Sequence, residues 1–471
     1  MMSNFLIAWR NLWRNRRRTI ITVASVLFAV FFALVMRSLQ LGTYDHMFRN
    51  VIESYTGYLQ VQNEDFWDSK TIDNLLEYTP GIEQQIMSNK NAVATVPRLE
   101  SFALASSGTL TKGVLVMGID PEKEDYFSNV RGKLVKYRLD ENNIEKLKGS
   151  AFSEKYKEKL DLFKGKSYSS RSAIMVDLGI TDDDSAAVMP FIRQHTSIEN
   201  GYIRMSEAGV LVGDRLAIFL NASIGDTLVL LGQGYHGTTA AGKFRINGIV
   251  RMPTSDFDNK IVFLPVDISQ ELYNATGMLT SLAIGVKNND DGEIDRMIES
   301  LGSMVEPPLK VIGWREMNEL LINQIEADSR SGMIMIAILY MVIAFGIFGT
   351  VLMMTAERKR EFGVLVAIGM QKTKLAAVIA IEMMYIGLMG VACGAAAALP
   401  VIFIGYHNPI RFSGEMARMY EDYGMEPVMP MMLPDVYFLW QTVVVALIVL
   451  IAVGFPVRKI MKMEVVNSLK A

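Results

Sequence analysis

The chain has 471 residues, with 47 Lys and Arg against 50 Asp and Glu, so its formal net charge is −3. This near balance argues against a nucleic-acid-binding protein, which usually carries a basic excess. The single cysteine excludes an intrachain disulfide and any zinc or iron–sulfur site built from several cysteines. The composition therefore leaves a globular or membrane protein without nucleic acid among its partners.

Charge is almost absent from four stretches of the sequence: residues 19–36, 331–356, 383–406 and 436–457. A helix needs about 20 residues to cross the roughly 30 Å hydrocarbon core of a bilayer. We therefore predict four transmembrane helices, with bounds at residues 19–38, 331–356, 375–405 and 436–457. A signal peptide is the alternative for the first, but the run is longer than a usual apolar region of about 7–15 residues and no small-x-small cleavage site follows it.

Basic residues gather in three of the segments between and beyond these helices: residues 1–18, 357–374 and 458–471. Acidic residues outnumber basic ones in residues 406–435. By the positive-inside rule, the three basic segments face the cytoplasm. Both termini are then cytoplasmic, residues 406–435 form a short loop on the outside, and residues 39–330 form a large domain there.

The outside region is predicted to be an α+β domain, because short Val-, Ile- and Leu-rich runs in it are bounded by Gly, Asp, Asn or Pro. These strand-like runs are residues 58–62, 92–105, 114–119, 209–212, 227–231, 244–250, 260–264 and 282–286. Helices are expected at residues 142–162, 294–301 and 314–330. The polar middle, residues 123–200, reads as an inserted subdomain. The expected fold is thus an α-helical membrane protein with four transmembrane helices and a large α+β domain between the first two.

Motifs for catalysis or metal binding are weak. Residues 164–167, Lys-Gly-Lys-Ser, resemble the end of a phosphate-binding loop, but Leu160 stands where the first glycine is required. The four histidines are far apart in sequence, so no local metal site is predicted. One loop contains six methionines: Met416, Met419, Met425, Met429, Met431 and Met432. Their thioethers can bind a soft metal such as Cu(I). Flexible apolar contact with lipid or a partner is the favoured alternative.

Within the third predicted membrane helix, Glu382 is a candidate intramembrane polar site, since acids in such helices are functional candidates by default. It either reaches the membrane interface or pairs with a basic residue. Gly387, Gly390 and Gly394 give the same helix a face of small residues. That face favours close helix packing, within this subunit or across a dimer.

Two predicted cytoplasmic elements are more informative. In residues 1–18, one helical face carries Phe5, Trp9, Leu12 and Trp13, with the arginines mostly elsewhere. This pattern predicts an amphipathic helix lying on the inner membrane surface. The link 357–374 mixes charges with a compact apolar group, which a bare linker does not need. It is therefore a candidate docking site for a cytoplasmic partner.

The motif E-R-x-R-E-x-G-x-L-x-A-I-G at residues 357–369 resembles the coupling segment of ABC-transporter permeases of the MacB/FtsX/LolCDE superfamily. Residues 8–19, 209–226, 244–249 and 456–469 resemble further parts of these permeases in the same order. Residues 57–61, Gly-Tyr-Leu-Gln-Val, resemble the G-H-[LI]-Q-[VI] stretch of the lipoprotein-releasing LolC/LolE branch, with Tyr58 in place of the histidine.

The resemblance implies a non-catalytic permease subunit of the cell inner membrane, with its large domain in the periplasm. ATP and Mg²⁺ would be bound by a separate cytoplasmic ABC ATPase dimer, so no cofactor is expected in this chain. A second permease, identical or related, would complete the membrane part. The ATPase movement would reach the membrane helices through Glu357, Arg358, Arg360, Glu361, Phe362, Gly363, Leu365 and Gly369. In this view the charged residues bond to the ATPase, and Phe362 and Leu365 fill its groove as anchors.

Three functions stay open within this resemblance. The first is the release of lipoproteins from the inner membrane to a periplasmic carrier, which the Gly-x-Leu-Gln-Val stretch favours. The second is MacB-like efflux of peptides or antibiotics. The third is FtsX-like mechanical regulation of a cell-wall hydrolase, which usually goes with a smaller exported domain.

Overall fold

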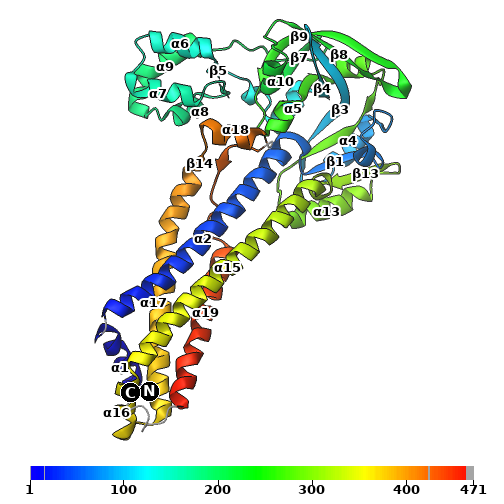
Figure 1. The fold of residues 1–471 in the computed structure, drawn as a ribbon. Helices are drawn as coiled ribbons and strands as arrows, with labels where there is room; N and C mark the ends of the chain where they lie inside the picture. Colours follow the sequence, from blue (N-terminus) through cyan, green and yellow to red (C-terminus); the bar gives the residue numbers. More distant parts are fainter. Residues whose placement is uncertain (1, 15, 423–424, 463–471) are drawn as a thin grey trace. The chain divides into compact units, whose positions relative to one another are not determined.

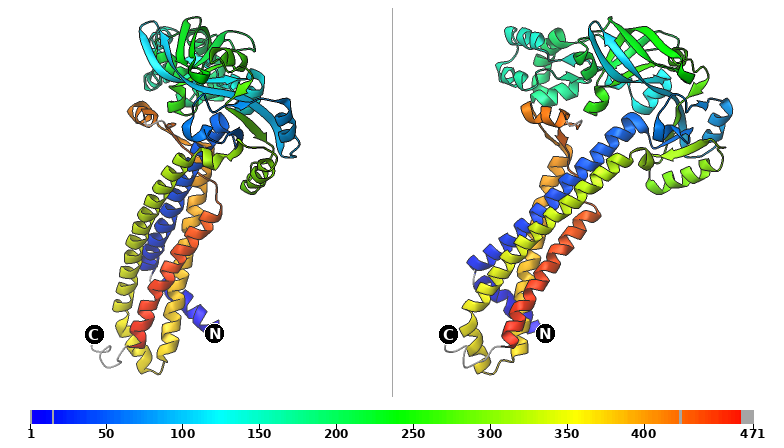
Figure 2. Two further views of the ribbon diagram at one scale, coloured as in Figure 1. Left: turned by 90° about the vertical axis from the view of Figure 1, so that its right-hand side faces the viewer. Right: turned by 45° about the vertical axis from the view of Figure 1, so that its right-hand side comes forward.

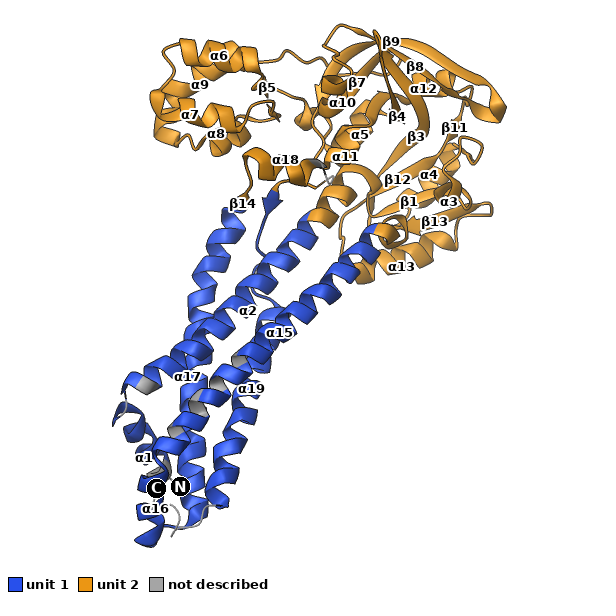
Figure 3. Cartoon of the chain, viewed as in Figure 1, with its two compact units in different colours: residues 1–46, 321–410, 428–471 blue, residues 47–320, 411–427 orange. Residues whose placement is uncertain are grey.

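The computed structural model describes residues 2–14, 16–422 and 425–462. The chain divides into two compact units (Figure 3). Unit 1 contains residues 1–46, 321–410 and 428–471, and unit 2 contains residues 47–320 and 411–427.

Unit 1 is built on four long helices: α2 (Arg16–Val51), α15 (Glu319–Glu357), α17 (Lys372–His407) and α19 (Val436–Met461). Each is long and apolar enough to cross a membrane. The short helix α1 (Met2–Arg14) precedes α2, and α16 (Lys359–Ala367) joins α15 to α17. Figure 2 shows the four long helices running alongside one another. The helices that contain the predicted spans 19–38 and 331–356 are considerably longer than those spans.

The core of unit 1 comes mainly from α2, α17 and α19. It includes Val26, Val30 and Leu34 of α2, Ile379, Met383 and Ile386 of α17, and Val445 and Val449 of α19. The apolar stretch of α15 is mostly exposed, since Ile334, Ile338 and Val342 all lie on the surface of the chain. A helix that is apolar all round is suited to lipid or to another membrane helix.

Unit 2 contains a sheet with the strand order β13-β1-β12-β3-β4-β10-β7-β9-β8. Its strands are β1 (Leu59–Asn63), β3 (Ala92–Ser107), β4 (Leu110–Ile119), β7 (Gly209–Gly213), β8 (Thr227–Gln233), β9 (Thr239–Val250), β10 (Ile261–Pro265), β12 (Ser281–Val286) and β13 (Leu309–Gly313). Because β8 also pairs with β3, the six strands from β3 to β8 close into a ring (Figure 1). Each of the eight predicted strands overlaps an observed strand, whereas β13 was not predicted.

Alternate residues of the closed strands point into one core. Val114 and Val116 of β4, Val210 and Val212 of β7, and Leu228 and Leu230 of β8 are all buried together. The spacing of two is the period of a strand with one buried face. The long strand β3 makes closure possible, since residues 103–106 pair with both β4 and β8.

The polar middle of the sequence forms a helical subdomain with a core of its own. It contains α6 (Glu141–Gly149), α7 (Glu154–Leu162), α8 (Arg171–Leu178) and α9 (Asp182–Thr196). Ile144, Tyr156, Leu160, Ile174 and Ile192 pack together there. The segment predicted to be helical at residues 142–162 is helical but divided in two, because Gly149 ends α6 and α7 begins after Ser153. We call residues 137–196 the inserted subdomain.

The helix predicted at residues 314–330 is confirmed from Glu319 onward, where α15 begins and runs without a break into the second predicted span. Asn318 separates α15 from the short helix α14 (Trp314–Met317). The side chain of Asn318 donates to the carbonyl oxygen of Trp314 at 2.8 Å, so it competes with the helical hydrogen-bond pattern.

Asp258 is a buried carboxylate at the N-terminus of α10 (Asp214–Phe219). Its oxygens accept hydrogen bonds from the backbone N–H groups of Asp214, Arg215 and Met252, at 3.2, 3.0 and 2.7 Å. Burial, and then the nearby Asp214 carboxylate, raise the pKa of Asp258 to about 7.

The raised pKa of Asp258 predicts that the stability of the protein depends on pH. The pKa of an aspartate in an unfolded chain is about 3.9, so the folded state favours the protonated form of Asp258. The resulting stabilisation is complete below about pH 4 and is lost as the pH rises through about 7. We expect the unfolding temperature of the detergent-purified protein to fall between pH 5 and pH 8. Asp258→Asn keeps one acceptor oxygen and should reduce that fall; an identical fall in the variant would contradict the assignment.

Candidate functional site

The candidate site is the turn of chain from the end of α15 to the start of α17. Arg358 interrupts the helix between α15 and α16, and its carbonyl oxygen accepts the N–H of Phe362 at 2.9 Å. At the other end, Met370 N–H donates to Leu365 and Gly369 N–H donates to Val366. These two bonds, with Gly369 at φ 104°, form a glycine C-terminal cap of the Schellman type. Gly369 thus has a local structural reason to be glycine.

Arg358 and Glu382 form a buried ion pair that holds α16 against α17. The guanidinium Nη1 of Arg358 lies 2.9 Å from both carboxylate oxygens of Glu382. Both side chains are nearly inaccessible, so the interaction is screened little by water. The pair resolves the two alternatives for Glu382, because it bonds to a basic residue of its own chain. It also corrects the expectation for Arg358, whose side chain is directed inward and is not free to contact a partner.

The apolar group of the link is divided between an inner and an outer face. Phe362 is only 2% exposed and belongs to the core of unit 1, and Arg358 lies over its ring at 5.2 Å. Gly363 is buried as well, and Leu365 is half-buried against the same core. Phe362 is therefore not an anchor for a partner, contrary to expectation, and Leu365 is only partly accessible.

The outer face of α16 presents different residues. Val364 is 46% exposed and Ile368 is 76% exposed. Glu357, Arg360 and Glu361 are exposed beside them. Spacings of three and four residues bring Glu361, Val364 and Ile368 to one side. Nothing in the sequence separates this face from the inner one, because apolar residues occur on both sides of a helix of nine residues.

Helix α1 packs on α17 and does not stand alone on a surface. Ala8 and Leu12 are buried, and the rings of Phe5 and Trp9 meet Tyr385 edge-on, with centroids 6.5 and 5.6 Å apart. The expectation that Leu12 shares the membrane-facing side is wrong, because Leu12 belongs to the core of unit 1. Arg14 of α1 also donates to Glu361 of α16 at 2.7 Å. Three elements, α1, α16 and α17, are thus joined around the candidate site.

The glycines of α17 lie where neighbouring helices of the same chain approach closely. A Cβ at Gly390 would lie 2.5 Å from Val26 Cβ of α2, and one at Gly394 would lie 2.7 Å from the Leu27 carbonyl oxygen. Gly387 faces Val449 of α19. The small-residue face therefore packs inside this chain, the first of the two alternatives.

Other motifs do not assemble into a site. Gly165 lies in a turn at φ 83° and donates to the Leu139 carbonyl oxygen, so residues 164–167 do not form a phosphate loop. Among the residues that the structure describes, no group of three or more His, Cys, Asp or Glu side chains could hold a metal ion. Of the six methionines, Met416, Met419 and Met425 belong to unit 2 and the other three to unit 1.

Comparison with known proteins adds a family match in unit 1. Residues 333–465 match the family described as FtsX-like permease C-terminal. An uncharacterized ABC transporter permease of Methanocaldococcus jannaschii is 28% identical over 156 residues, which cover 31% of this chain and 38% of that protein. The lipoprotein-releasing system transmembrane protein LolC of Xylella fastidiosa is 20% identical over 229 residues, which cover 47% of this chain and 54% of that protein. The matches thus span about half or less of these relatives.

A solved structure also overlaps the chain. The periplasmic region of MacB from Actinobacillus actinomycetemcomitans covers 58% of this chain and 95% of its own, at 12% identity and a TM-score of 0.30.

The buried ion pair predicts a non-additive mutant series. Arg358→Met or Glu382→Leu alone leaves one charge buried without its partner and should cost about 3–5 kcal/mol of stability. The double variant removes both charges and should cost less than either single change. Thermal or chemical unfolding in detergent would measure all three. The exposed pair Lys310–Glu316 of unit 2 is the control, since Lys310→Gln should cost at most about 1 kcal/mol. Additive losses at 358 and 382 would contradict the pairing.

The glycine contacts predict opposite effects at two helical glycines. Gly394→Ala would place a methyl group 2.7 Å from a backbone oxygen of α2 and should destabilise the protein by about 1–3 kcal/mol. Gly454→Ala in α19 meets nothing within 4 Å, so it should be neutral or stabilise by up to about 1 kcal/mol. Unfolding of both variants in the same detergent checks this. Equal effects at the two positions would exclude close packing at Gly394.

Proposed function

We propose that the chain is the membrane subunit of an ABC transporter, because residues 333–465 match the FtsX-like permease family and ABC-transporter permeases are among the similar proteins. The observation that carries the proposal is α16, a short helix held rigidly at one end by a buried ion pair and exposed on its other face. A helix so placed can receive a push from a soluble partner and pass it on.

A separate ABC ATPase is the proposed partner of the outer face of α16. Ile368 and Val364 are exposed apolar side chains that can enter a groove, as anchors of an interface commonly do. Glu361 and Arg360 beside them can form charge-assisted hydrogen bonds to the partner. ATP and Mg²⁺ would be bound by that ATPase, and this chain would perform no catalysis.

The proposed path of movement follows the contacts inside unit 1. A displacement of α16 reaches α17 through Arg358 and Glu382, and reaches α15 through the chain at Glu357. Helix α17 packs against α19 and α2 at its glycines, so the displacement spreads to the whole bundle. The proposed topology places both termini in the cytoplasm, because basic residues gather at the ends of the helices on that side.

A second permease, identical or related, is proposed to cover part of α15. The membrane stretch of α15 makes few contacts with its own chain in the described residues, although Tyr340 donates to Gln441 of α19. Exposed apolar residues such as Ile334 and Val342 fit lipid on one side and another permease on the other.

Release of lipoproteins from the inner membrane to a periplasmic carrier is the proposed work of unit 2. Two LolC proteins among the relatives and the Gly-Tyr-Leu-Gln-Val stretch at the start of β1 support it. MacB-like efflux and FtsX-like regulation of a hydrolase remain the alternatives. Gentle purification with mass spectrometry separates the three, through retained lipoproteins, an adaptor or a hydrolase.

The docking face predicts which substitutions abolish partner binding. Ile368→Asp and Val364→Asp should remove the ATPase from the purified complex, at least tenfold, because a carboxylate would be buried in an apolar groove. Membrane insertion and the unfolding temperature should stay unchanged, since both side chains are exposed in this chain. Co-purification of the ATPase with the tagged protein is the measurement.

Two control variants distinguish a loss of ATPase binding from a general effect of an added carboxylate or from unfolding. Val176→Asp alters an equally exposed valine in unit 2 and should leave ATPase binding intact. Phe362→Asp places a charge in the core and should destabilise the chain itself. Normal ATPase retention by both Ile368→Asp and Val364→Asp would refute the docking role of α16.

A further inference from the structure

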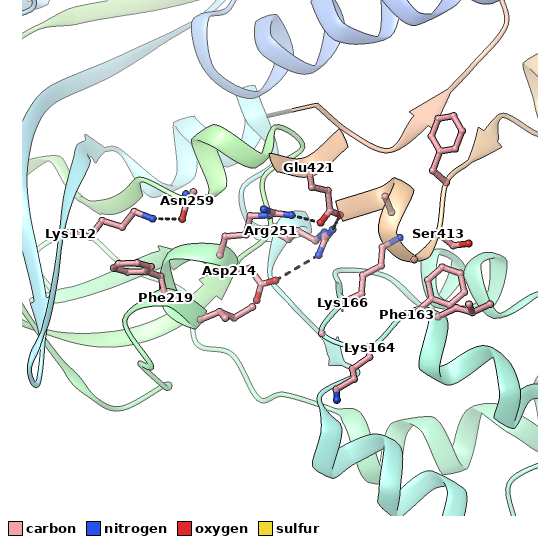
Figure 4. A pocket seen from close by; sticks show the side chains of 17 residues that line it. Lys112, Phe163, Lys164, Lys166, Asp214, Phe219, Arg251, Asn259, Ser413 and Glu421 are labelled. Atoms are coloured by element: carbon pink, nitrogen blue, oxygen red, sulfur yellow. Dashed lines mark hydrogen bonds and ion pairs between the residues drawn. The ribbon is translucent and has the colours of Figure 1, made fainter. Parts of the chain in front are cut away.

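A cleft of about 510 Å³ lies in unit 2, where three parts of the chain meet. One wall is the closed barrel, with Lys112 of β4 and the helix α10. Another is the turn after α7 in the inserted subdomain, and the third is the segment 412–421, which contains most of α18 (Gly414–Asp422). Figure 4 shows these side chains around the cleft. Its volume falls in the range of about 300–1,000 Å³ that holds small ligands.

Basic side chains dominate the lining, with five of them against two carboxylates. Among the described residues, two of the five basic side chains have no carboxylate within hydrogen-bond distance. The guanidinium of Arg251 is 28% exposed, and its nearest carboxylate oxygens, on Asp214 and Glu421, lie 3.7 and 3.9 Å away, beyond hydrogen-bond distance. Lys112 Nζ bonds to the amide oxygen of Asn259 at 2.5 Å and lies over the Phe219 ring, and no carboxylate of the described ranges lies within ion-pair distance of it. Each cation can therefore take an anion without giving up a close ion pair.

Asp214 is a buried carboxylate beside these basic side chains. Its side chain is 1% exposed, and its Oδ1 accepts from Arg138 and from Ser167. Its Oδ2 is buried, has no hydrogen-bond donor among the described residues, and lies 3.7 Å from Nη1 of Arg251. Asp214 therefore attracts the guanidinium of Arg251 at the cleft, while its own buried oxygen is not open to a ligand.

Apolar surface completes the lining. Ile218 and Phe219 of α10 and Leu162 of α7 are about half exposed where they border the cleft, and Phe412 contributes from the third wall. Exposed aromatic rings on a charged cleft favour a ligand with an apolar part next to its charges.

We propose that this cleft binds an acidic peptide segment. Its carboxylates pair with Arg251 and Lys112, and an apolar side chain lies on Phe219 and Phe412. An inorganic anion supplies only the first of these two groups. A peptide with acidic and aromatic residues in sequence supplies both within a short length. The site is independent of the proposed ATPase docking.

Glu421 is the internal competitor of such a peptide. It is bonded to Arg215 and faces Arg251, so it already places one carboxylate on the basic wall (Figure 4). An incoming carboxylate competes with Glu421 for these two arginines. Removing the charge of Glu421 therefore strengthens peptide binding, whereas removing the charge of Arg251 weakens it.

The test uses the full-length protein in nanodiscs and isothermal titration with the acetylated, amidated tripeptide Glu-Phe-Glu. We expect saturable binding, with none for the neutral tripeptide Gln-Phe-Gln. Arg251→Gln and Lys112→Gln should each raise the Kd at least fivefold, and Glu421→Gln should lower it at least threefold. Lys243→Gln, at an exposed lysine of β9 outside the cleft, should leave the Kd unchanged.

Three results would overturn the proposal. The first is the absence of saturable binding by the wild-type protein. The second is a Kd that none of the cleft substitutions changes, in variants whose unfolding temperature equals that of the wild type. The third is equally tight binding of glutarate or inorganic phosphate, which would assign the cleft to small anions. A failure here leaves ATPase co-purification unaffected, so it is distinguishable from a failure of the proposed function.

Discussion

The arrangement of the candidate coupling site depends on one buried ion pair, between Arg358 and Glu382. Removing two charges from water is costly, and good bonding geometry, here both carboxylate oxygens at 2.9 Å, is needed to offset that cost. The pair forms where the helix breaks at Arg358, so the arginine can turn inward while α16 starts in a new direction. Phe362 then packs below the guanidinium, whereas Val364 and Ile368 remain exposed.

Unit 2 uses a buried ion pair in a similar way. Arg98 of β3 is bonded to both carboxylate oxygens of Glu124, and both side chains are inaccessible. Arg98 also donates to the carbonyl oxygen of Tyr55, in the π-helical turn Ile52–Thr56 that follows α2. The strand that closes the barrel is thus tied to the residues that enter unit 2 from α2. In both units a buried ion pair thus joins two elements that are separate in the sequence.

Local sequence patterns predicted most of the long helices and the strands of the main sheet, whereas the candidate sites depend on contacts between residues far apart in the sequence. Charge-free runs and Val-rich segments identified the four long helices and eight of the strands, because length and alternation are properties of neighbouring residues. The partner of Arg358 lies 24 residues away, and apolar residues on both sides of α16 hid which side is buried. The cleft was not predicted, since Asp214, Arg251 and Glu421 come from distant parts of the chain. The Lys-Gly-Lys-Ser stretch was a partial signal, because its two lysines line the cleft without forming a phosphate loop.

The segment 411–427 differs in kind from the other connections between the units. Helices α2 and α15 cross the unit boundaries as unbroken backbone, at residues 46–47 and 320–321. The segment that joins α17 to α19 is instead fixed within unit 2 by side chains: Arg411 to Asp177, Glu421 to Arg215, and Glu426 to Asn50. The first two are partly exposed ion pairs, which competing ions can replace, whereas the hydrogen bonds of a helical backbone are not replaced in this way. In the proposed complex, a peptide carboxylate would therefore compete first at Glu421, on the segment between α19 and α17, the helix that carries Glu382.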